Sequence, residues 1–237
     1  MERKHYISSL VLLIGLFMIF SGCKKFLQKD LQGSLTQQSF PETASDALLA
    51  TNAAYESLRE WNYNSGGYPI LDIMSDDARK GSNPNDQSST VGPYDNFTFS
   101  PTGDGLDRWW TTLYLGVKRA NVVIVNLPDI DMDATLRTRY IAEARFIRGL
   151  IYFDFVRAWG GVQLVTDLTP PNGLTRASKE DVYALVLSDL QFASDNLPEK
   201  NEYLAKDLGR ATKGAANAML ARVYLWLHDF PHAEEYA

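Results

Sequence analysis

The stretch that decides the fold is Ala142–Val165, AEARFIRGLIYFDFVRAWGGVQLV. Its apolar residues recur at spacings of three and four, which indicates a helix with one buried face. That face consists of Tyr140, Ala144, Ile147, Ile151 and Phe155. The glycine pair Gly160-Gly161 should end the helix, because glycine is favoured just past helix ends. We therefore expect a long helix over 134–159 and a short extended piece over 162–166.

Helical patterns continue on both sides of this stretch. They predict further helices over 43–61, 107–127, 178–196, 211–227 and from 229 onward. Thr43 with Asp46, and Ser178 with Asp181, have the spacing of capping boxes at two of the starts. The expected fold class is all-α.

The last two expected helices carry a tetratricopeptide-like pattern of small and aromatic residues. Its members are Leu220, Ala221, Tyr224, Phe230, Ala233 and Ala237. Small residues let the two helices of a repeat approach, and aromatic residues fill the angle between them. Generic helix packing is the alternative for any one pair, but several pairs in series favour a repeat scaffold. The sequence stops within the last helix without a capping element, so we expect the domain to be incomplete at its C-terminus.

Residues 62–105 interrupt the helical pattern. Glycine, proline and asparagine punctuate this region densely, which is typical of loops. A loop of this length inside a compact domain is usually functional. We therefore place the candidate ligand site here.

The first 23 residues have the pattern of an export signal. A short basic start precedes the uncharged apolar run 10–20, LVLLIGLFMIF, which is too short to span a bilayer comfortably. Ser21-Gly22-Cys23 follows and contains the only cysteine of the chain. This ending resembles the lipobox of bacterial lipoproteins, which implies a signal peptide over 1–22, a lipidated Cys23, a tether over 23–41 and a helical domain over 42–237. The alternative is an ordinary cleaved signal with an incidental cysteine.

The charge and the cysteine content exclude some classes of function and some sources of stability. Without Glu2, Arg3 and Lys4, the chain has 21 basic and 28 acidic residues, a formal charge of −7. An acidic exported chain does not suit nucleic-acid binding, which requires basic patches. With one cysteine there is no disulfide framework, so stability must come from a packed core.

Four blocks in order resemble the SusD/RagB family of outer-membrane nutrient-binding lipoproteins. They are 107–121 (DRWWTTLYLGVKRAN), 142–165, 176–183 (RASKEDVY) and 209–237 (GRATKGAANAMLARVYLWLHDFPHAEEYA). Gln163 stands where the family usually has proline, and Asp181 where it usually has glutamate. Together with the lipobox, the blocks cover nearly the whole chain.

The resemblance implies a function. Family members are lipid-anchored at the outer membrane, usually exposed on the surface, and pass oligosaccharides to a SusC-like TonB-dependent transporter. They are considerably longer, and their C-terminal half contributes to the ligand surface. Lys24 and Lys25 leave the membrane leaflet open, since export signals there are often acidic. Two alternatives are a binder of peptides and an assembly scaffold without a small ligand.

No residue set supports an enzyme, a metal site or a cofactor. Several charged residues at helical spacing are interpreted as exposed ion pairs between repeat helices, each contributing about 0–1 kcal/mol, rather than as catalytic groups. They are Glu143, Arg145, Arg148, Asp154 and Arg157. A turn between His228 and His232 prevents a shared metal-binding face. The adjacent carboxylate pairs Asp76-Asp77 and Glu234-Glu235 point apart, unlike those of glycosidases.

Aromatic and polar residues of the irregular region form the candidate glycan site. A sugar presents apolar C–H faces and hydroxyl groups, so its site needs exposed aromatic rings beside polar side chains. The candidates are Trp61, Tyr63, Asn64, Tyr68, Asp77, Arg79, Asn83 and Tyr94, with Asn85, Asp86 and Asn96 in support. The alternative is a solvated loop with turn-forming Asn and Asp. Trp110 is expected in the core, whereas Trp109 and Trp159 fit either role.

Overall fold

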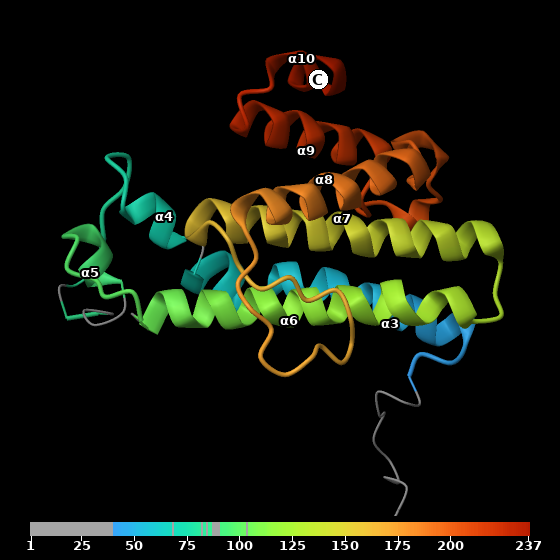
Figure 1. Ribbon diagram of the computed structural model, residues 1–237, viewed down its shortest axis with the longest axis horizontal. Helices are drawn as coiled ribbons and strands as arrows, with labels where there is room; N and C mark the ends of the chain where they lie inside the picture. Colours follow the sequence, from blue (N-terminus) through green and yellow to red (C-terminus); the bar gives the residue numbers. More distant parts are fainter. Residues whose placement is uncertain (1–39, 68, 82, 84, 87–90, 103) are drawn as a thin grey trace, which may run out of the picture. The chain divides into compact units, whose positions relative to one another are not determined.

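The computed structural model describes residues 40–237 except 68, 82, 84, 87–90 and 103, and this part of the chain contains helices and no strand (Figure 1). The expected signal peptide and Cys23 lie outside the described residues, as does Tyr68. No helix within the described part combines the length and the apolar character needed to cross a bilayer.

The six longer predicted helices are present, and their bounds are close to those expected. They are α3 (Ala44–Glu56), α6 (Asp104–Asn126), α7 (Ala134–Trp159), α8 (Lys179–Asn196), α9 (Lys213–Trp226) and α10 (Phe230–Tyr236). Both capping boxes form: the Thr43 hydroxyl accepts from the backbone N–H of Asp46, and the Ser178 hydroxyl accepts from that of Asp181. Single 3-10 turns occupy Ser57–Arg59, Leu127–Asp129, Lys200–Glu202 and Ala205–Asp207.

Consecutive helices from α6 to α10 pack on one another, and α3 packs against α6 and α7 (Figure 1). This serial pairing confirms the tetratricopeptide-like, all-α scaffold. The pair α9 and α10 is joined by aromatic stacking, with the Tyr224 ring 5.8 Å from Tyr236 and 4.9 Å from His232. Phe230 does not fill the angle between these helices as expected, because 59% of its surface is exposed.

The core is built around one face of α7. All five residues expected on that face are buried. On α6, however, the fully buried tryptophan is Trp109, whereas Trp110 is only partly buried at the core's edge. The expectation for Trp110 was therefore wrong in part: adjacent residues of a helix project about 100° apart, and on α6 it is Trp109 that points into the core.

Buried ion pairs connect the helices. Arg148 of α7 donates two hydrogen bonds to the Asp189 carboxylate of α8, at 2.7 and 2.8 Å, and a third to Asn121 Oδ1 of α6, at 2.8 Å. All three side chains are at least nine-tenths buried. Ion pairing was expected, but the assumption of exposed pairs was wrong, and buried pairs have larger consequences when broken.

A second ionic cluster surrounds Glu143, which has no exposed surface. Its carboxylate lies 2.7 Å from Arg210 and 3.3 Å from Arg139, and both arginines also pair with Asp207. Burial raises the pKa of Glu143, while Arg210 and Arg139 act in the opposite direction. The position of this carboxylate inside the scaffold fits a structural role.

Residues 62–105 are not purely loop. The chain forms a π-helical turn at Asn62–Gly67 and two short helices, α4 (Pro69–Ile73) and α5 (Gly92–Asp95). The many glycine and proline residues of this region indicated a loop, so the sequence did not predict these short helices. The remaining described stretches of this region are turns and irregular backbone.

The segment 162–166, expected to be extended, has no regular secondary structure, and side chains of α6 and α7 hold it. The Tyr152 hydroxyl accepts from the Val165 N–H at 2.7 Å, and Asn121 donates to the Val165 carbonyl at 2.8 Å. Gly161 packs so closely that an added Cβ would lie 2.1 Å from the Ala177 carbonyl oxygen. These contacts hold the segment that leaves α7 against α6 and α7, and they begin just beyond Trp159 at the end of α7.

Candidate ligand-binding site

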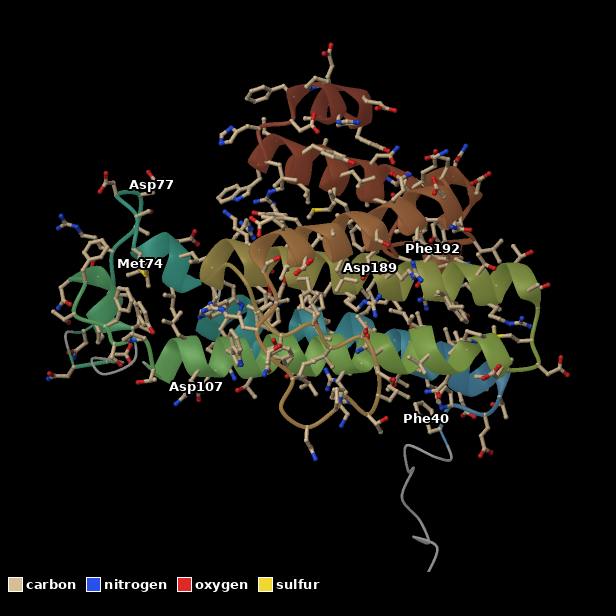
Figure 2. The ribbon with its side chains drawn as sticks, viewed as in Figure 1. Phe40, Met74, Asp77, Asp107, Asp189 and Phe192 are labelled. Atoms are coloured by element: carbon tan, nitrogen blue, oxygen red, sulfur yellow. The ribbon has the colours of Figure 1, made fainter. Side chains whose placement is uncertain are left out.

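A cleft of about 280 Å³ lies where α6 begins and α7 ends. It is lined by Pro101, Thr102, Leu106, Asp107, Trp110 and Trp159. The first two residues belong to the end of the irregular region, and Asp107 lies in the first turns of α6 (Figure 2). The cleft therefore combines the rigid helical scaffold with the region in which a ligand site was expected.

Two indole rings form the apolar part of the cleft. The rings of Trp110 and Trp159 meet edge to face, with centroids 5.2 Å apart. Trp159 also packs 4.9 Å from the buried Trp109, and Trp110 packs 5.1 Å from Phe155. Both rings are only partly buried, so the core fixes one side of each while another part stays accessible. Aromatic rings held in this way form a preorganised surface.

Side chains of the irregular region pack against the start of α6 and position it. An added Cβ at Gly105 would lie 2.5 Å from Ile70 and 3.3 Å from the Tyr94 ring, so both side chains press directly on this helix start. The Tyr94 hydroxyl accepts a hydrogen bond from the Leu106 N–H at 3.3 Å. These tertiary contacts therefore fix the start of α6, which adjoins the cleft.

The chemistry of the cleft suits a sugar. The indole faces match the apolar C–H faces of a pyranose ring, and the exposed Asp107 and Thr102 side chains provide hydrogen-bonding groups for hydroxyls. No group of three metal-ligating side chains occurs in the described chain. The turn lies at Leu227 and His228, slightly before the expected position, and His232 lies inside α10, so the two histidines do not share one helix.

Five of the sequence-predicted site residues are exposed. Trp61 shows 68% of its surface, and Asn64, Asp77, Arg79 and Asn83 are also exposed. Figure 2 shows Asp77 at the bend that follows α4. Asn83 accepts from the Asn85 N–H at 3.0 Å, which is the turn-forming role of the alternative interpretation. The structure thus places these side chains at the surface, and none of them lines the cleft.

Tyr63 and Tyr94 are not exposed aromatic rings, and this expectation was wrong. Tyr94 retains 1% of its surface and stacks on Phe99, with centroids 5.0 Å apart. Tyr63 retains 9% and donates a hydrogen bond to Asp154 at 2.9 Å beside a small cavity of about 90 Å³. Burial raises the pKa of Asp154, although Arg157 and the Tyr63 hydroxyl favour its charged form. Both tyrosines therefore position the region from inside.

Comparison with known proteins agrees with this architecture. A profile of the SusD-like family, described as "Starch-binding associating with outer membrane", matches residues 43–225. The chain belongs to the SusD-like family. A SusD-like protein of Bacteroides ovatus is 32% identical over 230 residues, which cover 92% of this chain and 39% of that protein. A second, from Formosa agariphila, is 27% identical over 227 residues, covering 90% and 42%.

Solved structures of SusD-like proteins have the same fold. A laminarin-binding SusD-like protein superposes with a TM-score of 0.73 at 30% identity, over 82% of this chain and 42% of that one. A SusD-like carbohydrate-binding protein from Bacteroides fragilis gives a TM-score of 0.68 at 25% identity, over 82% and 39%. This SusD-like chain therefore spans about two fifths of the length of these relatives.

The cleft of this SusD-like chain contains residues that sequence reasoning did not select. Asp107 was not selected at all, and Trp110 and Trp159 were treated as scaffold or left open. One signal was present: Trp109 and Trp110 are adjacent on a helix and project about 100° apart, which suits them to different depths in the core. Nothing in the sequence indicated that Trp159 approaches Trp110.

Proposed function

We propose that this protein captures oligosaccharides at the outer membrane, using the cleft formed by Trp110 and Trp159, and passes them to a SusC-like TonB-dependent transporter. The observation that carries the proposal is the pair of partly buried indole rings beside Asp107, where α6 begins and α7 ends. The laminarin-binding relative, which shares the fold at 30% identity, supports a sugar as the ligand. The protein is proposed as a binder rather than an enzyme, since Glu143 has no exposed surface.

The exposed polar residues of the irregular region extend the proposed ligand surface. Trp61, with 68% of its surface exposed, offers an additional ring, and Asn64, Asp77, Arg79 and Asn83 offer hydrogen-bonding groups. Tyr63 and Tyr94 contribute by holding this region against α6 and α7. Tyr68 remains a candidate from the sequence.

Membrane attachment is proposed through a lipid on Cys23, such as palmitate, with residues 23–41 as the tether. The support is the lipobox-like ending Ser21-Gly22-Cys23, together with the outer-membrane association in the description of the family. Labelling cells with a radioactive fatty acid tests this step. Label should enter the native protein and disappear in Cys23→Ser, and equal labelling of both would contradict lipidation at this residue.

Calorimetric titration with a panel of neutral oligosaccharides and of peptides tests the ligand class. We expect heat with at least one oligosaccharide, and a loss of affinity of about tenfold or more in Trp110→Ala, because an aromatic anchor typically contributes at least about 1.4 kcal/mol. Leu204→Ala is the matched control, since Leu204 is 64% exposed and outside the cleft. Binding of peptides alone would support the peptide alternative and contradict the proposal.

Co-purification from membranes tests the proposed transporter. A SusC-like TonB-dependent protein should be recovered with the tagged protein, and its absence would contradict the proposed delivery step. Recovery of the transporter without binding of any oligosaccharide would instead support the alternative of an assembly scaffold.

A further inference from the structure

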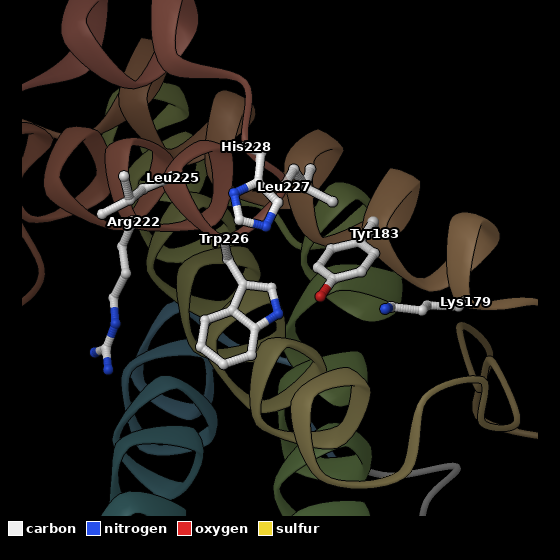
Figure 3. A pocket seen from close by; sticks show the side chains of 7 residues that line it. All are labelled: Lys179, Tyr183, Arg222, Leu225, Trp226, Leu227 and His228. Carbon is white, nitrogen blue, oxygen red and sulfur yellow. The ribbon is translucent and has the colours of Figure 1, made fainter.

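A larger cavity of about 640 Å³ lies between α8 and α9, and none of its residues belongs to the cleft described above. Figure 3 shows its lining side chains, Lys179, Tyr183, Arg222, Leu225, Trp226, Leu227 and His228. Leu225 and Leu227 are exposed by 57% and 37%, and Trp226 by 52%. The cavity is therefore open and accessible in this structure.

The charge of this cavity opposes that of the chain. The whole sequence has a formal charge of −6, yet the lining contains Lys179, Arg222 and His228 and no carboxylate. Neither Lys179 nor Arg222 makes a direct ion pair or hydrogen bond within the described part of the chain. Arg222 also lines the small cavity beside Asp154, and its charge favours the ionised form of that carboxyl group. In contrast, Arg139, Arg148, Arg157 and Arg210 all pair with acidic side chains. Cationic groups left unpaired in a concave site attract an anion.

The Tyr183 hydroxyl provides an independent indication of a ligand. Tyr183 retains only 5% of its surface, and its hydroxyl meets no partner at full hydrogen-bond geometry among the described residues, although the Trp226 side chain interacts with it and opposes the rise in its pKa that burial causes. Figure 3 shows this hydroxyl turned into the cavity, between Lys179 and the N–H edge of Trp226. A buried hydroxyl without a partner costs stability unless another group satisfies it. A bound ligand with polar groups would supply that partner.

Trp226 gives the cavity an aromatic wall that the scaffold holds. The edge of Phe153 contacts it, with centroids 6.3 Å apart, and the Arg157 guanidinium lies 5.8 Å from the ring centre. About half of its surface remains exposed to the cavity and to solvent. A ring supported in this way can stack against the apolar face of a pyranose, as in other small-molecule sites.

We propose that this cavity is a second glycan subsite, specific for sugars that carry an anionic group, either a uronic acid carboxylate or a sulfate ester. The inference rests on the proposed glycan-binding function. The pyranose ring packs on Trp226, and the Tyr183 hydroxyl bonds a sugar oxygen. Arg222 and Lys179 bind the anion, and a guanidinium can hold either a carboxylate or a sulfate through two parallel hydrogen bonds.

Calorimetry with three probes of equal length tests the subsite: an oligogalacturonate, a sulfated oligosaccharide and a neutral oligosaccharide. We expect at least one charged probe to bind more tightly than the neutral one, with an affinity that falls as salt is raised. Arg222→Gln and Trp226→Ala should each weaken that probe by about tenfold or more, since each removes a group in direct contact with the ligand. Circular dichroism confirms that both variants are folded.

The variants separate this proposal from the proposed function. Trp110→Ala should weaken the neutral probe, whereas Lys179→Gln and Arg222→Gln should leave that probe unchanged. Binding of the neutral probe alone would overturn the subsite and leave the proposed function intact. Binding of a charged probe that is unaffected by Arg222→Gln and Trp226→Ala would also overturn the subsite, and failure of all three probes would overturn both.

Discussion

Breaking the Arg148–Asp189 pair should destabilise the scaffold strongly. Arg148→Met keeps much of the side-chain volume and removes three hydrogen bonds, two to Asp189 and one to Asn121. Asp189 is then left at 1% exposure with Arg145, at 3.9 Å, as its remaining ion-pair partner. Removing one partner of a buried pair costs about 3–5 kcal/mol, and we expect the lower part of this range because Arg145 remains.

Urea denaturation of the native protein and the variant measures this free energy of unfolding. A loss of 3–5 kcal/mol corresponds to a fall of roughly 6–20 °C in melting temperature for a domain of this size. Arg59→Met is the matched control, since Arg59 pairs with Glu56 at the surface, where side-chain exposures are 80% and 55%. Such pairs contribute about 0–1 kcal/mol.

A double variant tests the cause of the loss. Arg148→Met with Asp189→Leu removes both charges, and apolar replacement of a whole buried pair is often neutral. The double variant should therefore recover most of the stability lost in Arg148→Met. A cost below about 1 kcal/mol for Arg148→Met, or no recovery in the double variant, would refute the reasoning.

Three further outcomes follow from local geometry. Gly161→Ala should destabilise by about 1–3 kcal/mol, because its Cβ would meet the Ala177 carbonyl oxygen at 2.1 Å. Gly81→Ala should be near neutral by thermal melting, because its Cβ would lie 4.0 Å from the nearest atom, the Arg79 carbonyl oxygen. Ser178→Ala should cost about 0.5–2 kcal/mol in urea denaturation through loss of the α8 cap, and an unchanged midpoint would contradict this. Burial raises the pKa of Tyr114 from 10.0 to about 12, so its contribution to stability is present below pH 10 and is lost as pH rises toward 12, because the unfolded chain ionises first. Urea denaturation over this pH range should show a smaller decline in Tyr114→Phe than in the native protein.

The helical scaffold could be predicted because its signals are local. Helical periodicity placed α7 at its observed bounds, 134–159, and the Thr43 and Ser178 capping boxes marked the starts of α3 and α8. Local patterns could not show that Arg148 and Asp189 meet, since 41 residues separate them. Their burial depends on how α7 and α8 pack, so the strength of the ionic contacts was underestimated.

The candidate site was less predictable because it depends on contacts between distant segments. Composition predicted a ligand site within residues 62–105, but it could not distinguish the exposed Trp61 from the buried Tyr63 and Tyr94. The cleft itself requires Trp159, at the end of α7, to approach Trp110, near the start of α6. The second cavity likewise depends on the packing of α9 against α8, which no sequence motif predicts.

A crystal structure of the protein with a bound oligosaccharide tests the central claim most directly. The ligand used would be one that binds in the calorimetric panel and is uncharged. We predict a pyranose ring packed against the indole of Trp110 or Trp159, with a sugar hydroxyl hydrogen-bonded to Asp107. A ligand bound elsewhere on the surface, with this cleft empty, would contradict the account.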